Sequence, residues 1–514
     1  MCFFILLGVI FSFVSAEEPA AEKRLTLKDA IFQALKSNLD LQIEKTTTQL
    51  ALETLKINNS LFIPTLQLDG GMQKSLRPSV NIYQGVDTVE TTTKEMTFTI
   101  GENLPTGGRL SIFFYNSLDD TNSLDARLDP SYSAYSGIRL TQPLLKGIGS
   151  LATKYQIYIA SNNVRMSKYQ LQARIAQLVY DVEAAYWELV YAHQNMGATK
   201  MSLKRAQDWL TQNELKVKVG TAAPIEILSS KAQVASNESS MIRAEQAIQS
   251  REEALKRILN MSQDTSVILP VDQPEVKSLD VNFDSFLQEA LQNRLDIKQA
   301  QLTVDNNQLQ VKYAKNQALP TLQLSANYST YGTGGTFWKI PDNLSPFDPD
   351  FKRIQVDKTT LGDAWREVFK MTNKNYSVSL SLQVPLWMKR EKAELSQAKI
   401  NRERSRLQLQ NTENMVYSEV KEIVKEFQSS LKLVDAEKIA LQLEEENLKA
   451  EEKRLAVGLS TNFNVLDYQR RVATAQSSML RSVIDYSLTQ ARINRILNRT
   501  FQVYGINFGE FYEK

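Results

Sequence analysis

The stretch KVGTAAPIEIL, residues 218–228, places a glycine and a proline inside a long run of residues that favour helix. A related stretch, AVGLSTNFNVL, lies at residues 456–466, with the Val-Gly pair and the last leucine in register. Glycine ends helices because it reaches positive φ at little cost, and proline suits the first turn of the next helix. Both stretches therefore predict a tight turn between two helices, and their recurrence predicts a duplicated chain.

Other pairs of segments support the duplication. The two members of a pair lie 256 residues apart near the start of the repeat and 238 residues apart near its end, so the first copy carries extra residues. Each half should then contain the same order of elements. The pairs are ALKSNLDL (34–41) with ALQNRLDI (290–297), PTLQL (64–68) with PTLQL (320–324), LTQPLL (140–145) with LQVPLW (382–387), SSMIR (239–243) with SSMLR (477–481), and RILN (257–260) with RILN (495–498).

In each half, a helix leads into a β-rich region, which is followed by a very long helix, the glycine-marked turn and another helix. A helix of about 68 residues would be roughly 100 Å long, so elongated helical hairpins are expected rather than a globule. The expected first repeat is 17–260, with a helix at roughly 26–60, strands at 64–142, a long helix at 151–218 and a helix at 225–260. A linker (261–282) precedes the second repeat (283–498), with a helix at roughly 283–318, strands at 320–386, a long helix at 389–456 and a helix at 463–498, and residues 499–514 form a tail.

The β-rich regions alternate apolar and small polar residues. In YSVSLSLQVPLW, residues 376–387, the apolar side chains fall on one face of a strand, and Ser377, Ser379 and Ser381 fall on the other. Alternation over about ten residues is typical of a transmembrane β-strand that lines a wet lumen. A soluble sandwich strand with one solvated face would show the same pattern. Similar alternation occurs at 64–72, 95–100 and 109–116.

The first 16 residues have the features of a secretory signal peptide. An apolar run from Cys2 to Val14 is followed by the small-residue site Val-Ser-Ala at 14–16, where a signal peptidase could cut. The basic residues that usually precede such a run are missing, and a short membrane anchor is the alternative. Beyond residue 16 no run of about 18 apolar residues is present. For an exported chain with alternating strands, a β-barrel is the favoured explanation.

The composition argues against several classes of function. The 60 basic and 58 acidic residues leave a net charge of +2, which gives no indication of nucleic-acid binding. Cys2 is the only cysteine and is lost with the predicted signal peptide, and the single histidine, His193, is expected to be structural. Metal clusters of His and Cys, a phosphate-binding glycine loop and a nucleophile elbow are absent from the sequence. The protein is therefore not expected to be an enzyme, and it is not expected to bind a cofactor or a metal.

The two halves, each with strands between long helices and a helix break that begins Val-Gly, resemble the TolC-like outer-membrane efflux protein family over essentially all of residues 25–500. The resemblance implies a mixed fold of helices and transmembrane strands. A homotrimer would share one outer-membrane β-barrel, with about four strands per protomer, and one long periplasmic α-helical barrel. It also implies outer-membrane lipid, a periplasmic adaptor and an inner-membrane pump as partners, and a role as the exit duct for drugs, metals or proteins.

In that family the two helix breaks lie at the periplasmic tip, where the duct narrows shut and meets the adaptor. The resemblance therefore implies adaptor-docking turns in both halves of this chain. Turns between antiparallel helices would need the same residue types without any docking role, and this alternative remains open. The implied docking residues are Val219, Gly220, Thr221, Val457, Gly458 and Leu459.

Acidic residues just beyond those turns line the constriction in the family. The matching positions here are Glu226, Asn464 and Asp467, and the family's tyrosine and arginine positions are occupied by Leu455 and Ser460. Rings of three carboxylates at Glu226 and Asp467 would favour cations in a narrow pore. An acid in the first turn of a helix is also favoured by the helix dipole and by capping, and this is the competing explanation.

Two segments depart from the family pattern. GENLPTGGRLSIFF, residues 101–114, predicts either an extra hairpin in the barrel wall, giving more than four strands, or strands that extend into a surface loop. Residues 337–370 form a long insertion that is expected to make an extracellular loop and could cap the outer mouth. An exported coiled-coil structural protein and a passive porin remain the alternative functions.

Overall fold

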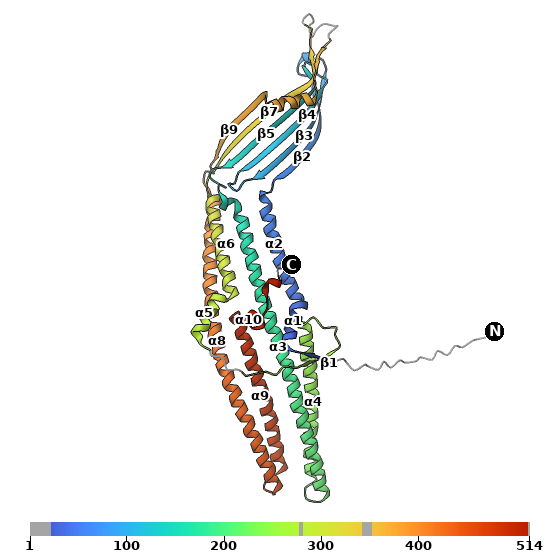
Figure 1. Ribbon diagram of the computed structural model, residues 1–514, viewed down its shortest axis with the longest axis vertical. Coiled ribbons are helices and arrows are strands. Elements are labelled where there is room, and N and C mark those ends of the chain that lie inside the picture. Colours follow the sequence, from blue (N-terminus) through green and yellow to red (C-terminus); the bar gives the residue numbers. More distant parts are fainter. Residues whose placement is uncertain (1–21, 277–280, 342–351, 512–514) are drawn as a thin grey trace, which may run out of the picture. The chain divides into compact units, whose positions relative to one another are not determined.

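The computed structural model describes residues 22–276, 281–341 and 352–511 (Figure 1). It confirms the mixed helix and strand class. The predicted signal peptide, residues 1–16, lies outside the described residues. The chain divides into two compact units. The helical unit contains the described residues up to Gln49 together with Met166–Gln299 and those from Gln410 onward, and the sheet-containing unit contains Leu50–Arg165 and Ala300–Leu409.

The helices of the first half are α1 (Leu27–Ser37), α2 (Leu39–Asn59), α3 (Ser150–Lys218) and α4 (Ile225–Ile258). The sequence predicts one helix over 26–60, whereas the structure has a break at Asn38, whose backbone is extended. The Asn38 amide donates to the carbonyl of Ile258 at 3.0 Å, and its side-chain oxygen accepts from the amide of Leu41 at 3.1 Å. Asn38 thus ends one helix, caps the next and binds the end of α4.

The second half repeats this arrangement. Its helices are α5 (Phe283–Asn293), α6 (Leu295–Gln317), α8 (Lys389–Ala456) and α9 (Asn462–Ile496). Arg294, the counterpart of Asn38, separates α5 from α6 in the same extended conformation. The two RILN segments end at Asn260 and Asn498, both with φ of 57°. The duplicated sequence therefore gives duplicated backbone geometry. None of the described helices has an apolar stretch long enough to cross a membrane.

The sheet consists of long antiparallel strands in the order β2-β3-β4-β5-β7-β9, and the short β8 (Ile354–Lys358) pairs with the far end of β7 (Figure 1). Residues 101–114 form the end of β3, a tight turn and the start of β4, so they make an extra hairpin within the sheet. The described part of one chain therefore supplies six long strands, more than four, as the extra-hairpin alternative predicts. The strands are β2 (Thr65–Pro78), β3 (Thr88–Asn103), β4 (Arg109–Thr121), β5 (Leu128–Pro143), β7 (Thr321–Lys339) and β9 (Asn373–Gln383).

Strand register gives the sheet two chemically different faces. Residues that pair across neighbouring strands point to the same face of the sheet, so the pairing register shows which residues form a row on each face. One apolar row runs Leu66, Ile100, Ile112, Ile138, Tyr328 and Tyr376, and the next contains Leu68, Phe98 and Phe114. The opposite face carries Thr97, Thr99, Ser111, Tyr115, Tyr135, Arg139, Asn327, Ser329 and Tyr331.

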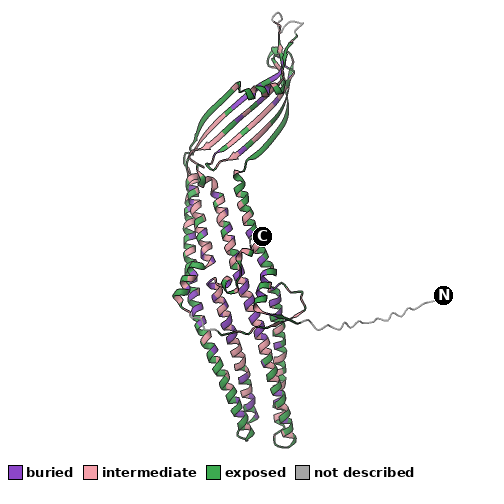
Figure 2. Cartoon of the chain, in the orientation of Figure 1, coloured by how far each residue is buried: buried purple, intermediate pink, exposed green. Residues whose placement is uncertain are grey.

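The two edges of the sheet are exposed. Along β2 and β9 nearly all residues are open to solvent, and they form the green margins of the sheet in Figure 2. On β9, Tyr376 is 81% exposed and Val378 is 74% exposed. Within the described residues, β2 pairs only with β3, and β9 pairs only with β7. Each edge therefore offers free backbone groups next to exposed apolar side chains.

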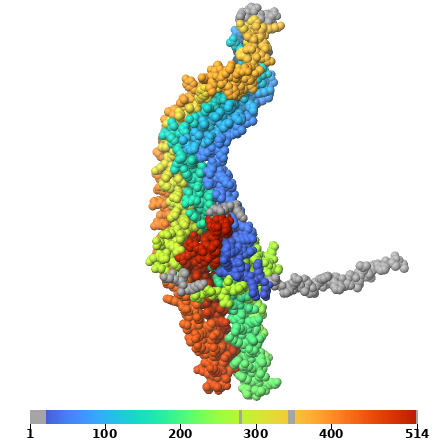
Figure 3. All heavy atoms as spheres, viewed as in Figure 1, coloured from blue at the N-terminus to red at the C-terminus, as the bar shows by residue number. Residues whose placement is uncertain are grey.

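A hydrophobic core surrounds the middle of α3 in the helical unit. Tyr186 is fully buried there, and its hydroxyl donates to the carbonyl of Leu25 at 3.0 Å. Leu25 ends β1 (Glu22–Leu25), which pairs in parallel with β6 (Val267–Pro270) from the inter-repeat segment. The C-terminal residues, including α10 (Thr500–Tyr504), pack on the same core; they are the dark red atoms beside the blue N-terminal helices in Figure 3.

Candidate functional site

The two predicted turns have the same backbone geometry. Gly220 (φ 76°) follows α3, and Gly458 (φ 78°) follows α8. In the first turn the Thr221 amide donates to the Lys216 carbonyl at 2.9 Å, and the Gly220 amide donates to the Val217 carbonyl at 3.0 Å; the equivalent bonds in the second turn are also 2.9 and 3.0 Å. The Thr221 hydroxyl donates to the same Lys216 carbonyl at 3.0 Å. This pair of bonds defines a Schellman helix end, which needs a residue at positive φ and so accounts for both glycines.

Apolar side chains around both turns are exposed. Val219 is 71% exposed and Leu459 is 79% exposed. A Cβ placed on Gly220 or Gly458 would meet no atom within 4 Å. A helix turn needs glycine for its conformation, but it does not need apolar neighbours in solvent, and groups of such residues mark interaction surfaces. These residues, called the turn patches below, are Val219, Ile225 and Leu228 at the first turn and Val457, Leu459 and Phe463 at the second.

Glu226 joins the two helical hairpins through Asn462 at the start of α9. The Asn462 side-chain amide donates to the Glu226 carboxylate at 2.9 Å and to the side-chain oxygen of Asn213 in α3 at 3.4 Å. Asn213 in turn donates to the Ser230 hydroxyl at 2.8 Å, and that hydroxyl donates to the Glu226 backbone carbonyl at 2.8 Å. Asn213 is fully buried, and Ser230 and Asn462 are 1% and 8% exposed. These four residues, called the tip link below, tie α3 and α4 to α9.

Ser460 and Asn464 lie together in a second polar cluster, within the α8–α9 hairpin. The Ser460 hydroxyl donates to the carboxylate of Glu451, which also accepts from Arg454 at 3.2 Å. The Asn464 side-chain amide donates to Ser460 at 3.3 Å. The hydrogen bond from Ser460 lowers the pKa of Glu451 below its usual value, and Arg454 adds to this effect. The hydrogen bonds of this cluster join α8 to α9 across the second turn and so help to fix that turn.

Asp467 is paired with two arginines of its own helix. Its carboxylate accepts from Arg470 at 2.5 Å and from Arg471 at 2.8 Å. Desolvation by burial acts to raise the pKa of Asp467, but the hydrogen bonds from Arg471 and Arg470 outweigh it, and the pKa lies below its usual value. The two guanidinium groups leave this part of α9 with a net positive charge, so Asp467 does not present an isolated carboxylate.

Leu455 lies in an apolar cluster near the second turn. It packs against a core made of Leu448, Val465 and Val472, together with Trp209 from α3. This cluster provides an apolar contact between the first hairpin and α8–α9, next to the tip link. Leu455, at a position where the family resemblance implies a polar residue, thus contributes packing in this chain.

No sequence motif marks the other residues of these two polar clusters, which are Asn213, Ser230, Asn462 and Glu451. Asn462 is 236 residues away from Glu226, and no local pattern reports a contact of that range. One signal was present in the repeat, because an offset of 238 residues aligns Asn462 with Pro224. A polar residue that replaces a proline next to a helix cap is a candidate for a new hydrogen bond.

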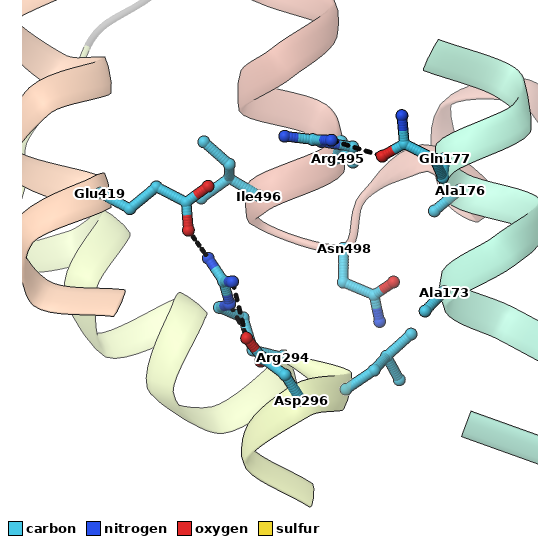
Figure 4. A pocket seen from close by; sticks show the side chains of 10 residues that line it. Ala173, Ala176, Gln177, Arg294, Asp296, Glu419, Arg495, Ile496 and Asn498 are labelled. Carbon is cyan, nitrogen blue, oxygen red and sulfur yellow. Dashed lines mark hydrogen bonds and ion pairs between the residues drawn. The ribbon is translucent and has the colours of Figure 1, made fainter. Parts of the chain in front are cut away.

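A polar pocket of about 250 Å³ lies elsewhere in the helical unit (Figure 4). Arg294 reaches Glu419 at 2.5 Å and Asp296 at 2.7 Å, and Arg495 donates to Gln177. The charged groups therefore bind one another, which is typical of a structural ion-pair network. Within the described part of the chain, no group of three or more His, Cys, Asp or Glu side chains is placed to hold a metal ion.

Comparisons with known proteins identify relatives across both halves. The family model described as outer membrane efflux protein matches residues 30–261 and 286–499. Outer membrane protein TolC from Vibrio cholerae is 21% identical over 339 residues, covering 66% of this chain and 71% of the relative. Outer membrane protein TolC from Escherichia coli is 23% identical over 368 residues, covering 68% and 70%.

Solved structures share the fold. The CmeC outer membrane channel of Campylobacter jejuni superposes with a TM-score of 0.65 at 15% identity, covering 92% of this chain and 85% of that one. The family model covers most of the chain and matches each half separately. The chain therefore belongs to the outer membrane efflux protein family, a family of channels that reside in the outer membrane and extend into the periplasm.

Proposed function

We propose that three copies of this chain form the outer-membrane exit duct of a tripartite efflux pump or a type I secretion system. The long strands of each copy join into one closed barrel in the outer membrane. The α3–α4 and α8–α9 hairpins close the periplasmic tip, a periplasmic adaptor binds the turn patches, and adaptor and inner-membrane pump together open the tip.

The observation that carries the proposal is the sheet, with one apolar face, one polar face and two exposed edges at β2 and β9. Six strands are too few to close a membrane barrel, for which about eight is the smallest number. Exposed edges that are long and apolar also invite pairing with another chain. Three copies of six long strands would give eighteen, a number compatible with an aqueous channel. Pairing of β9 with β2 of the next copy would remove every edge.

Disulfide trapping tests this arrangement. The only cysteine in the sequence is Cys2, within the predicted signal peptide, so introduced cysteines can be followed without background. A chain carrying Leu68→Cys on β2 together with a cysteine at 378, 380 or 382 on β9 should give covalent trimers on oxidation at one of these registers. The variant with Leu68→Cys alone should stay monomeric on a denaturing gel. Monomers in native mass measurements and no trapped trimer at any register would refute the proposal.

The turn glycines provide a separate prediction about the adaptor. Gly220→Leu and Gly458→Leu should together abolish transport while leaving the trimer intact. The added side chains enter open space, and positive φ costs each about 1–2 kcal/mol, which a trimer of this size tolerates. Export is measured in cells, and adaptor binding is measured with purified protein.

Gly505→Leu is the matched control for this pair. Gly505 has φ of 64° and equally open surroundings, but it lies after α10 and away from both turns. It should therefore keep full transport. Wild-type transport and adaptor binding in the double variant would remove the docking role from the turns.

A further inference from the structure

A short helix, α7 (Leu361–Lys370), lies against the apolar face of the sheet (Figure 1, orange). It belongs to the insertion at 337–370, for which the sequence predicts an extracellular loop; residues 342–351 of this insertion lie outside the described part. Thr360 caps the helix in a capping box with Asp363. Ala364 and Val368 are buried against Ala134 of β5. The helix is therefore a docked element of the sheet.

Small residues of the sheet, called the glycine seat below, let this helix approach the strands closely. Gly332 and Gly334 of β7 lie directly under it: a Cβ on Gly332 would overlap the carbonyl oxygen of Ala364, and one on Gly334 would lie 2.6 Å from that of Thr360. Ala134 is the cross-strand partner of Gly332, so small residues continue across two strands. Glycine weakens a strand interior, and close approach of another backbone is one of the reasons for its presence there.

The helix lies where the apolar face ends. On β7 the apolar residues extend from Leu322 to Tyr328, about 20 Å along the strand at 3.3 Å per residue. The next residues outward on this face are polar or small on most strands, and they lie at the strand ends far from the connections to α2, α3, α6 and α8. On each of four strands, an apolar residue is followed on the same face by a polar one: Met96 by Lys94 on β3, Phe114 by Asn116 on β4, Tyr328 by Thr330 on β7 and Tyr376 by Lys374 on β9.

Two aromatic rings lie side by side along α7. Trp365 contacts the ring of Phe114 at 6.1 Å between centroids, and its indole N–H donates to Asn116 at 2.6 Å. Phe369 packs on Trp365 at 5.6 Å and is 71% exposed. Trp365 thus touches Phe114 and the polar Asn116 that follows it on the same face of β4. Met371, just after the helix, is 52% exposed.

We propose that α7 is an interfacial helix that rests in the outer leaflet at the boundary between acyl chains and headgroups, with Phe369 in contact with lipid. The inference rests on the proposed function, because it takes the apolar face of the sheet to be within the membrane. Aromatic side chains with one polar end are enriched at this boundary, and amphipathic helices lie in its plane. Arg366 and Lys370, on the side of α7 away from Ala364 and Val368, remain with the headgroups. The seated helix fixes how deeply the barrel sits.

Spin labels on single cysteines test the inference in the full-length protein, reconstituted in vesicles of phosphatidylethanolamine and phosphatidylglycerol. A label at Phe369→Cys should collide more often with oxygen than with a water-soluble nickel chelate, and its depth should be shallower than that of a label at Leu380→Cys on β9. In Gly332→Val the helix loses its seat, so the label at 369 should lose its preference for oxygen while the label at 380 keeps it.

Each other outcome has a distinct meaning. A label at 380 in lipid with a label at 369 in water overturns the interfacial helix and leaves the barrel intact. A label at 369 that neither reagent reaches also overturns it, because another protein surface then covers the helix. Water at both positions refutes the membrane barrel itself. An unchanged label at 369 in Gly332→Val overturns the role of the glycine seat.

Discussion

In the proposed duct, replacing Asn462 with alanine is expected to open the periplasmic tip. In planar lipid bilayers the wild-type duct should show small or rare openings, whereas Asn462→Ala should show longer and larger ones. Asn462 is the residue of the tip link that bridges the two hairpins, and it binds both Glu226 and Asn213. Alanine suits the first turn of a helix, so α9 itself should keep its start.

The size of the effect follows from the bonds that are lost. A hydrogen bond to a charged group contributes about 1.5–3 kcal/mol. The side-chain oxygen of the fully buried Asn213 would also lose the hydrogen bond that it accepts from Asn462. A loss of about 2 kcal/mol in each chain corresponds to a change of about 30-fold in its opening equilibrium. Single-channel recording measures this as the open probability.

A matched control and a double variant separate the link from general disturbance. Asn464→Ala removes an amide of the same helix that binds Ser460 within one hairpin, and it should leave the open probability near wild type. Glu226→Ala should open the tip much as Asn462→Ala does, and combining them should add little, because both cut the same bond. Full additivity of the two substitutions would contradict the link.

The same recordings test the charge of Glu226. If the carboxylate lines the pore, Glu226→Gln should lower the preference for cations over anions. If its main role is the tip link, glutamine keeps an acceptor for Asn462, and ion preference should stay unchanged. The contact at 2.9 Å favours the second result.

Much of the fold could be predicted because it depends on local signals. Gly220 and Gly458 mark the helix turns because their positive φ is a property of the backbone at one residue. The alternation on β9 reports its two faces because neighbouring side chains of a strand point in opposite directions. The extra hairpin at 101–114 was recognisable from its turn, but the choice between wall and loop needed the pairing of β3 with β4.

The features that escaped prediction depend on distant contacts. Glu226 and Asn462 meet only after both hairpins have formed. The seat of α7 requires Gly332 to lie under Ala364, which no local pattern reports. The pairing of Asp467 is different, because arginines three and four residues later on a helix are a readable signal. That signal weakens the expectation of a carboxylate ring at Asp467.

A buried carboxyl group makes the helical unit sensitive to pH. Glu183 of α3 is 5% exposed and lies next to Tyr504 of α10. Burial raises the pKa of Glu183 to about 7, although a hydrogen bond from Tyr504 acts to lower it. In the unfolded chain the pKa of glutamate is about 4.3. Between these values the folded state holds a proton that the unfolded state has lost, so stability decreases as the pH rises.

Glu183→Gln is therefore expected to stabilise the protein at pH 8 and to have little effect at pH 4. Each pKa unit corresponds to about 1.4 kcal/mol, so the loss of wild-type stability that follows from raising the pKa from about 4.3 to about 7 reaches about 4 kcal/mol per chain. It is complete above pH 7, where both states are ionised. The glutamine oxygen can still accept from Tyr504. Thermal melting of the helical signal, followed from pH 4 to 8, should give a smaller decline for the variant than for wild type.

Two further variants decide whether Glu183 is the cause. Glu214→Gln, at an exposed position of the same helix, should keep the wild-type decline. Tyr504→Phe removes the donor that lowers the pKa of Glu183, so its decline should extend to higher pH than in wild type. Identical pH profiles for wild type and Glu183→Gln would show that folding does not raise the pKa of this carboxyl group. The stability gain at pH 8 would then be absent, because no buried proton would remain to be lost.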